Sequence, residues 1–194
     1  MHYWYQRTTK WCNRSSHFAG SSTGSTSTQW QSTINTTSTG NRRARHTAWQ
    51  AAVKAAGDGV SDVRQAGVQA LAALAPLLTE TQIDAAWQAA LKAAGDDDWH
   101  VRQAGAQAIT ALAPLLTGTQ IDTALQAALK AAGDDDSVVR RAGAQTITAL
   151  APLLTGAQMD TAWQGAIKAA SGDDSYVRQA GAQAIAALAL LLTG

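Results

Sequence analysis

Residues 84–114 read DAAWQAALKAAGDDDWHVRQAGAQAITALAP, and residues 122–152, which lie 38 positions later, read DTALQAALKAAGDDDSVVRRAGAQTITALAP. Looser copies flank this pair. Four arginines mark the same place in successive copies, each 38 residues from the next: Arg64, Arg102, Arg140 and Arg178. A fixed period of this length is the signature of a protein built from stacked repeats. We therefore divide residues 44–194 into four repeats, at about 44–80, 81–118, 119–156 and 157–194.

Two helices are expected in each repeat, because apolar residues recur there at the spacing of an amphipathic helix. In the second repeat, Ile83, Trp87 and Leu91 predict a first helix over about residues 81–94, capped by Thr79 or Thr81. A second stripe predicts a second helix over about residues 99–116. The other first helices are expected at about residues 45–56, 119–132 and 157–170. The expected fold class is all-α, an α-solenoid of four 38-residue helical hairpins after a disordered N-terminal tail.

Proline and glycine recur at fixed places in the predicted second helices. Pro114 removes a backbone hydrogen bond and predicts a kink or an early end of the helix, as do Pro76 and Pro152. Leu190 stands in this place in the last repeat. Glycine in the middle of a helix weakens it, so its recurrence predicts a close approach of two helices at each of these positions. They are Gly67, Gly105, Gly143 and Gly181.

The first 43 residues have a different composition and form a separate region. Ser and Thr dominate residues 15–40, and neither helical nor strand periodicity is present, which predicts a disordered tail. Residues 1–45 contain six Lys or Arg and no Asp or Glu, for a charge of +6. This composition leaves targeting of the chain to an organelle open. Otherwise we expect a cytoplasmic location.

Charge and cysteine content argue against several classes of protein. Residues 46–194 carry nine Lys or Arg against fourteen Asp or Glu, a charge of −5, so binding to nucleic acid is not expected. Cys12 is the only cysteine, which rules out a scaffold of intramolecular disulfides. No apolar run reaches the length that spans a membrane, so no membrane contact is expected.

The sequence predicts no catalytic, cofactor-binding or metal-binding residues. The four histidines are dispersed and have no nucleophile beside them in a pattern typical of catalysis. The aspartate runs 96–98 and 134–136 offer oxygen ligands, but they lack the spacing of a calcium loop. A structural role is favoured instead, because an aspartate just before a helix can cap its free N–H groups. Such aspartates precede the second helices of three repeats: Asp98, Asp136 and Asp174.

The combination of a helical hairpin, an Asp-containing turn and the motif Val-Arg-x-Ala resembles the HEAT-like repeat family. Asp98, Val101, Arg102 and Ala104 carry this resemblance, and the same offsets recur over about residues 45–194. In the first repeat Val60 replaces the aspartate, leaving Asp58 or Asp62 to substitute for it. The family implies an α-solenoid that holds other macromolecules. It also implies a ladder of Asp and Arg residues that joins adjacent repeats, with these members: Asp98, Arg102, Asp136, Arg140, Asp174 and Arg178.

Candidate partner-binding residues emerge when the repeats are compared with one another. The two positions before Val-Arg change fully in character and include residues that anchor interfaces. They supply Trp99, His100, Val138 and Tyr176, and the polar face of the second helices supplies Gln103, Gln107 and Arg141. Neutral variation at exposed positions explains the same pattern equally well.

The expected function is a non-enzymatic interaction module whose partner is an unidentified protein or peptide. Two alternatives remain. One is a HEAT-like enzyme or accessory of the bilin lyase type. The other is a structural fragment of a longer array, for which self-association through the terminal repeat is expected.

Overall fold

The computed structural model describes residues 26–192 of the chain, with side-chain positions from residue 41 to residue 191. The chain divides into two units, residues 1–42 and residues 43–194. The second unit contains the repeats, and the following description concerns this unit except where α1 extends beyond it.

Each repeat consists of two α-helices, and no strand occurs among the described residues. The first helices are α1 (Thr26–Ala56), α3 (Glu80–Ala94), α5 (Gly118–Ala132) and α7 (Gly156–Ala170). The second helices are α2 (Ser61–Leu74), α4 (Trp99–Leu112), α6 (Ser137–Leu150) and α8 (Ser175–Leu192). The predicted fold class is therefore confirmed, and the starts of the first helices in repeats 2 to 4 lie within one residue of their expected positions.

Helix α1 begins much earlier than the sequence predicts. It starts at Thr26 rather than near Arg45, so residues 26–43 are helical where we expected an irregular tail. A packed helical segment can extend outward because each added residue gains one hydrogen bond without a new nucleation cost. Apart from Gly40, which the helix includes, no proline or glycine lies between Thr26 and Arg45 to stop this extension. The predicted disorder of residues 1–25 falls outside the described residues.

The recurring prolines end the second helices early, as predicted. Helix α4 stops at Leu112 and continues as a short 3-10 turn, η2 (Ala113–Leu115), which contains Pro114. The same turn follows α2 as η1 (Ala75–Leu77) and α6 as η3 (Ala151–Leu153). Helix α8, in which Leu190 replaces the proline, runs without interruption to Leu192. The difference between the last repeat and the others therefore follows from this one residue.

Capping defines where the first helices begin. Thr79 is the N-cap of α3, and its backbone N–H donates to the Oε1 atom of Gln82 at 3.0 Å. Of the two predicted caps, Thr79 and Thr81, the structure therefore uses Thr79. Thr117 with Gln120 and Thr155 with Gln158 repeat the arrangement at 2.9 and 2.8 Å. These pairs satisfy N–H groups that would otherwise lack a partner at the helix start.

The recurring mid-helix glycines lie where the two helices of a repeat touch. A Cβ atom added at Gly105 would lie 2.3 Å from the backbone nitrogen of Ala94 in α3. The equivalent distance is also 2.3 Å at the other three glycines: Gly67, Gly143 and Gly181. No side chain fits at such a distance. The predicted close approach is confirmed.

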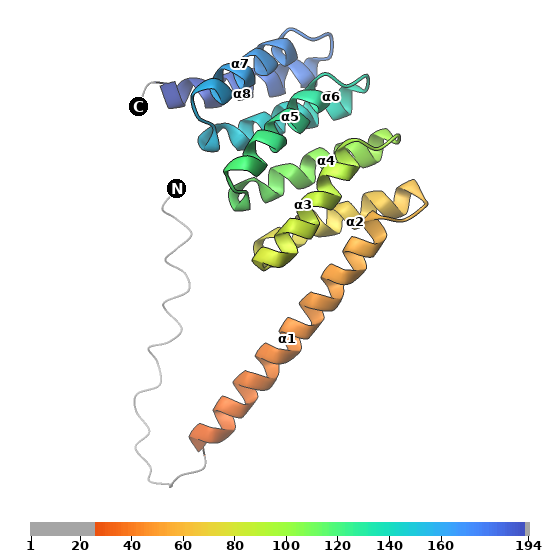
Figure 1. Cartoon of the computed structure of the whole chain (residues 1–194), viewed down its shortest axis with the longest axis vertical. Coiled ribbons are helices and arrows are strands. Elements are labelled where there is room, and N and C mark those ends of the chain that lie inside the picture. Colours follow the sequence, from red (N-terminus) through yellow and green to blue (C-terminus); the bar gives the residue numbers. More distant parts are fainter. Residues whose placement is uncertain (1–25, 193–194) are drawn as a thin grey trace. The chain divides into compact units, whose positions relative to one another are not determined.

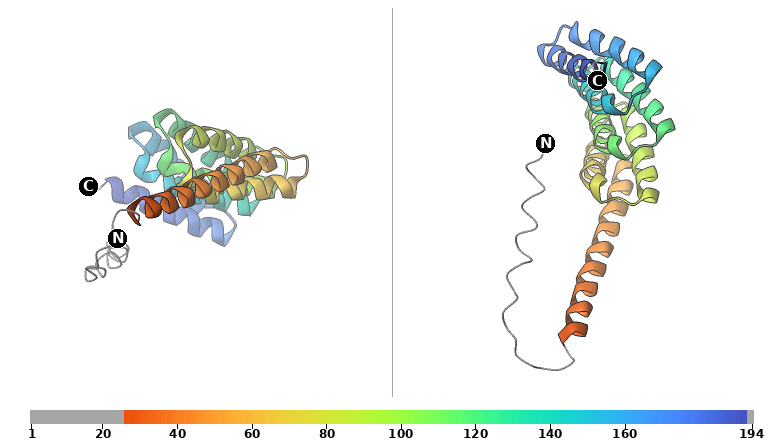
Figure 2. Two further views of the ribbon diagram at one scale, coloured as in Figure 1. Left: turned by 90° about the horizontal axis from the view of Figure 1, so that it is seen from below. Right: turned by 90° about the vertical axis from the view of Figure 1, so that its left-hand side faces the viewer.

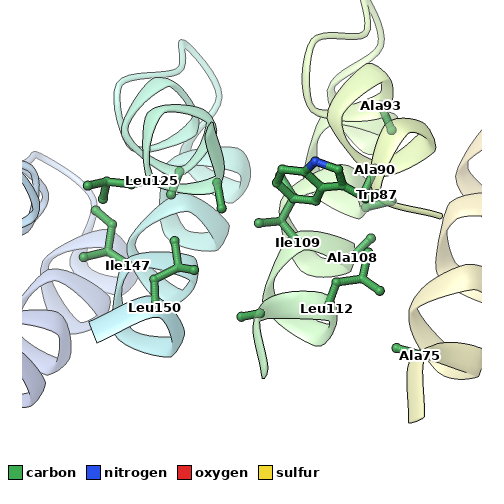
Figure 3. Close-up of a cluster of buried hydrophobic side chains, with 14 of the residues drawn as sticks. Ala75, Trp87, Ala90, Ala93, Ala108, Ile109, Leu112, Leu125, Ile147 and Leu150 are labelled. Atoms are coloured by element: carbon green, nitrogen blue, oxygen red, sulfur yellow. The ribbon is translucent and has the colours of Figure 1, made fainter. Parts of the chain in front are cut away.

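Stacking of the repeats creates one large hydrophobic core and two smaller buried clusters. Second helices pack directly on one another and form a layer, while the first helices form a second layer beside it (Figures 1 and 2). Val63 in the first repeat is 39% exposed, whereas its equivalents Val101, Val139 and Val177 are at most 1% exposed. Each repeat therefore buries the next one. In Figure 3, Trp87 and Ile109 meet in this core, where Leu125 and Ile147 are the corresponding pair of the next repeat.

Candidate partner-binding surface

The turn between the two helices of each repeat positions the start of the second helix. Asp98 accepts a hydrogen bond from the backbone N–H of His100 at 2.9 Å, and Asp136 accepts one from Val138 at 2.8 Å. Asp174 accepts from Tyr176 at 2.8 Å in the same way. These three aspartates are the N-caps that the sequence predicted.

The first repeat lacks this cap. Val60 is the N-cap residue of α2 and supplies no side-chain hydrogen bond. Asp58 instead accepts from the backbone N–H of Val60 at 2.9 Å, inside the turn. The prediction that Asp58 or Asp62 substitutes for the missing cap is therefore wrong. Asp58 is too early in the turn, and Asp62 lies within the helix rather than before it.

The arginine of each Val-Arg motif folds back onto its own turn. Arg102 donates through Nη1 to the backbone oxygens of Asp96 and Asp97 at 3.2 and 2.9 Å. Arg140 makes the same two contacts with Asp134 and Asp135 at 3.0 and 2.8 Å. Arg64 and Arg178 also bind two carbonyl oxygens of their own turns. The four guanidinium groups are therefore held by the same anchor.

The remaining donors of two arginines reach the next repeat. Arg64 donates through Nε and Nη2 to the two carboxylate oxygens of Asp96, both at 2.8 Å. Arg102 makes the same bidentate pair with Asp134, both bonds again at 2.8 Å. Two parallel charge-assisted bonds are the strongest form of this interaction. A ladder of Asp and Arg residues therefore joins repeats 1, 2 and 3.

The ladder uses different aspartates from the predicted ones. We expected Asp98, Asp136 and Asp174 to pair with the arginines, but these residues cap the second helices instead. The partners are Asp96 and Asp134, which stand two residues earlier. An N-cap carboxylate must face the first turn of its own helix. The aspartate two positions before it faces the neighbouring repeat.

The ladder stops between repeats 3 and 4. Asp96 and Asp134 have Gly172 as their equivalent in the fourth repeat, 38 residues after Asp134. Within the part of the chain that the structure describes, Arg140 has no carboxylate partner. Its Nη1 contacts remain, but no side chain faces its Nε and Nη2 atoms from position 172.

The paired aspartates are stabilised in their charged form. Hydrogen bonds from Arg64 lower the pKa of Asp96 below its ordinary value. Burial by itself would raise the pKa of Asp134, but the hydrogen bonds that it accepts, led by those from Arg102, together with the charge of Arg102 outweigh burial, and the pKa is lowered. The same bonds raise the pKa values of Arg64 and Arg102. Protonation of Asp96 or Asp134 therefore weakens its ion pair and destabilises the folded state.

The predicted residues Trp99 and His100 lie at the start of α4. Their rings stack with centroids 3.5 Å apart, and the Nδ1 atom of His100 is 3.2 Å from Asp98. His100 is exposed. Trp99 is half-buried and packs against the cluster that contains Val139 and Ala142 of the next repeat. Trp99 therefore contributes to the stacking of repeats as well as to the surface.

The predicted residues Tyr176 and Arg141 come together although they belong to neighbouring repeats. Tyr176 is 63% exposed, and the guanidinium carbon of Arg141 lies 6.0 Å from the centre of its ring. This distance permits a cation–π contact. Val138 is half-buried at the start of α6. We define the turn edge as Trp99, His100, Val138, Arg141 and Tyr176.

The polar face of the second helices is narrow. On α4, Gln107 is exposed and Gln103 is half-buried, whereas two other polar residues point into contacts between repeats. Arg102 belongs to the ladder, and Thr110 lies 2.9 Å from the hydroxyl of Thr146. The exposed column of this face consists of one glutamine per repeat: Gln69, Gln107, Gln145 and Gln183. A column of four residues that share one spacing is visible in the sequence once the repeats are aligned.

Among the described residues, no group of three or more His, Cys, Asp or Glu side chains is arranged to hold a metal ion. Among residues 26–192, no helix is long and apolar enough to cross a membrane.

Comparison with known proteins supports the same family. Residues 88–116 match the HEAT repeat family. No curated protein matches the chain. The HEAT-like repeat resemblance seen in the sequence is supported by this match over residues 88–116, and the fold is similar to that of solved repeat proteins.

Solved structures of similar fold include an engineered protein and two designed armadillo repeat proteins. One is an engineered protein with a TM-score of 0.59 and 19% identity, over 73% of this chain and 62% of the other. A designed armadillo repeat protein has a TM-score of 0.54 and 23% identity, over 71% of this chain and 63% of the other. Another, in complex with the peptide (KR)4, has a TM-score of 0.56 and 21% identity, over 71% and 62%. The chain thus spans under two thirds of their lengths, and identities this low show the fold alone.

Proposed function

We propose that the chain is a non-enzymatic interaction module that binds a protein or peptide along the turn edge and the exposed face of the second helices. The observation that carries this proposal is the turn edge itself. The two positions before each Val-Arg motif change fully in character from repeat to repeat, and the turn edge exposes His100 and Tyr176, with Arg141 beside Tyr176. Aromatic and arginine side chains are the residues most often responsible for binding energy.

Glutamine columns alone do not distinguish the two layers. The first helices carry their own exposed column: Gln50, Gln88, Gln126 and Gln164. What favours the second helices is that Gln107 and Gln183 lie seven residues after His100 and Tyr176, on the same face of α4 and α8 and about two turns away. An amide side chain both donates and accepts hydrogen bonds, so a column of them suits the backbone of a bound peptide. The complex of a designed armadillo repeat protein with a peptide supports this general mode for a similar fold.

The test is co-purification of a partner from the native host, followed by binding measurements with two sets of substitutions. The first set, His100→Ala, Arg141→Ala and Tyr176→Ala, removes the accessible turn-edge side chains. We expect at least a tenfold loss of affinity, because interface anchors contribute about 2 kcal/mol or more each. The matched control, Gln88→Ala, Gln126→Ala and Gln164→Ala, alters the first helices and should bind as the unmodified chain does. Equal binding by both variants would remove the turn edge from consideration.

A second candidate function is head-to-tail association of copies of the chain. A groove of about 450 Å³ on the outer side of repeat 1 is lined by small apolar residues that include Ala51, Ala55 and Ala66. Their equivalents in repeat 2 are Ala89, Ala93 and Ala104, which repeat 1 covers. Asp58 is the ladder aspartate of repeat 1, and Arg178 is the ladder arginine of repeat 4. A second copy can therefore continue the stack.

Light scattering over a range of concentrations tests this association. We expect the apparent mass to rise with concentration, and we expect Arg178→Asp to suppress the rise by placing two carboxylates together. Combining Arg178→Asp with Asp58→Arg should restore it, since the pair is then reversed. A constant apparent mass at every concentration would rule association out.

A further inference from the structure

A notch lies between repeats 3 and 4 at the place where the ladder stops. Its volume is about 450 Å³, and its walls include Arg140 from α6, Lys168 from α7, and Gly172 and Asp173 from the turn of the fourth repeat. Ser171 also contributes to the wall. The notch has two cationic side chains and one carboxylate, in a repeat region whose overall charge is negative.

The orientation of Arg140 determines what the notch can bind. Its Nη1 atom is held by the backbone oxygens of Asp134 and Asp135, as the Nη1 atom of Arg102 is held by Asp96 and Asp97. A guanidinium group is planar and rigid, so fixing Nη1 in the same way directs Nε and Nη2 in the same direction. In Arg64 and Arg102, this direction leads to a carboxylate of the next repeat. In Arg140 it leads to the notch.

The chain itself therefore contains two examples of the ligand that fits. Asp96 and Asp134 present both carboxylate oxygens to Nε and Nη2, with all four bonds at 2.8 Å. The side chain that would do the same for Arg140 is absent because position 172 is glycine. Lys168 adds a second positive charge. An added Cβ atom at Gly133 would lie 3.4 Å from its Nζ atom, so the ammonium group borders the turn of repeat 3.

We propose that this notch binds a carboxylate group supplied from outside the chain, the side chain of an Asp or Glu of the bound partner, at Nε and Nη2 of Arg140. The source of the carboxylate rests on the proposed interaction function, whereas the site can be tested with small molecules alone. A carboxylate in this place completes the third step of the ladder. Binding of the partner then also ties repeat 4 to repeat 3.

The test follows the Nε–H resonances of the arginines in the full chain by NMR during titration with sodium acetate, with sodium chloride at equal ionic strength as the reference. We expect the Arg140 resonance to shift in a saturable manner with acetate and to show no such shift with chloride. Arg64 and Arg102, whose carboxylate partners are already in place, should remain unchanged. N-acetylglutamic acid α-amide should act as acetate does, and the corresponding glutamine compound should not.

Two substitutions at position 172 test the site, one that adds a carboxylate and one that serves as its control. Gly172→Asp supplies the carboxylate internally, so the Arg140 resonance should already be shifted and should not respond to acetate. Gly172→Ala adds only a Cβ atom, which would lie 3.4 Å from the backbone oxygen of Ala169, and should keep the response. The absence of a saturable acetate shift, or an equal response in Gly172→Asp, would overturn the proposal.

Asp173 provides a further check, because its carboxylate also lines the notch. If Asp173 occupied the site, Asp173→Asn would gain an acetate response that the unmodified chain lacks, and this result would also overturn the proposal. Loss of partner binding in the turn-edge variant is measured separately and does not affect the acetate titration. Failure of the carboxylate site and failure of the proposed function are therefore distinguishable.

Discussion

At the scale of single residues, position matters more than residue type in the aspartate runs. Asp96 and Asp98 are two residues apart, yet Asp98 caps its own helix and Asp96 binds the arginine of the preceding repeat. Asp97, between them, is exposed. Asp134 and Asp136 divide the roles in the same way, but Asp135 differs from Asp97 because it also accepts a bond from Nη2 of Arg102 at 2.9 Å. Within one run of aspartates, one residue therefore stabilises a helix of its own repeat and another binds the neighbouring repeat.

The ladder arginines should differ in their contribution to stability. Arg102→Gln leaves the carboxylate of Asp134, whose side chain is 11% exposed, without its ion pair. We expect a loss of about 2–4 kcal/mol in the free energy of unfolding. Arg140→Gln removes only bonds to carbonyl oxygens and should cost about 1 kcal/mol. Urea unfolding followed by circular dichroism measures both. Equal losses would show that the inter-repeat pair contributes nothing beyond the bonds to the turn.

Acid should weaken the same joints. The pKa values of Asp96 and Asp134 are lowered in the folded chain, so the unfolded chain binds more protons at low pH. The stability that these groups contribute is present in full above the unfolded pKa of about 3.9. It is lost as pH falls from there through the lower folded pKa.

Melting temperatures measured from neutral pH down to about pH 3 follow this loss, since the stability declines only after the pH has fallen below the ordinary aspartate pKa. The double variant Asp96→Asn, Asp134→Asn should be less stable at neutral pH and should show a flatter dependence on pH. A dependence as steep as that of the unmodified chain would assign the acid sensitivity to other carboxylates.

At the scale of the helical hairpin, the mid-helix glycines determine how closely the two helices approach. Gly105→Ala favours the helix by up to about 1 kcal/mol in local propensity. It also places a Cβ atom 2.3 Å from the backbone of Ala94, which cannot move as a flexible side chain can. We expect overall destabilisation of about 1–3 kcal/mol, as for overpacked cores.

Gly118→Ala is the control for this prediction, since nothing lies within 4 Å of the added Cβ atom. Its melting temperature should stay close to that of the unmodified chain. If Gly105→Ala raised the melting temperature, helix propensity rather than close packing would explain the recurring glycine.

Much of the hairpin could be predicted from the sequence, because its signals are local or repeated. The apolar stripes located the first helices of repeats 2 to 4 within one residue, and the prolines located the 3-10 turns. The start of α1 could not be predicted, since residues 26–40 carry no stripe and the helix extends from a packed segment. The ladder partners were missed because three adjacent aspartates are equivalent until the direction of each side chain is known.

The candidate surface was predictable only in part, for a related reason. Comparing repeats identified His100 and Tyr176 as exposed, variable positions. It could not reveal that Trp99 packs on the next repeat, or that Arg141 approaches Tyr176, because these contacts depend on how the repeats stack. Gly172 was visible as an interruption of an aspartate column. Its importance appears only once Arg140 is seen to face it.

At the scale of the whole repeat region, the interface between repeats 3 and 4 should be the least protected of the three. Stability in a stacked array depends on interactions between nearest neighbours, and this interface lacks the ion pair that joins the others. Amide hydrogen exchange should therefore be faster in α7 and α8 than in α3 and α4. Gly172→Asp should slow exchange in α7 and α8 by about 5- to 30-fold, which corresponds to 1–2 kcal/mol.

Gly172→Ala is again the control, and its exchange should match that of the unmodified chain. Uniform exchange across all four repeats would show that the repeat region opens as a single unit. The missing ion pair would then have no local effect.

Hydrogen exchange of the full chain, measured with and without its co-purified partner, tests most directly whether a partner binds along the turn edge. We predict that the partner slows exchange in the first two turns of α4, α6 and α8, which carry His100, Arg141 and Tyr176. The exposed sides of α3, α5 and α7 should be unaffected. Protection confined to the first helices, with no change at the turn edge, would contradict this account.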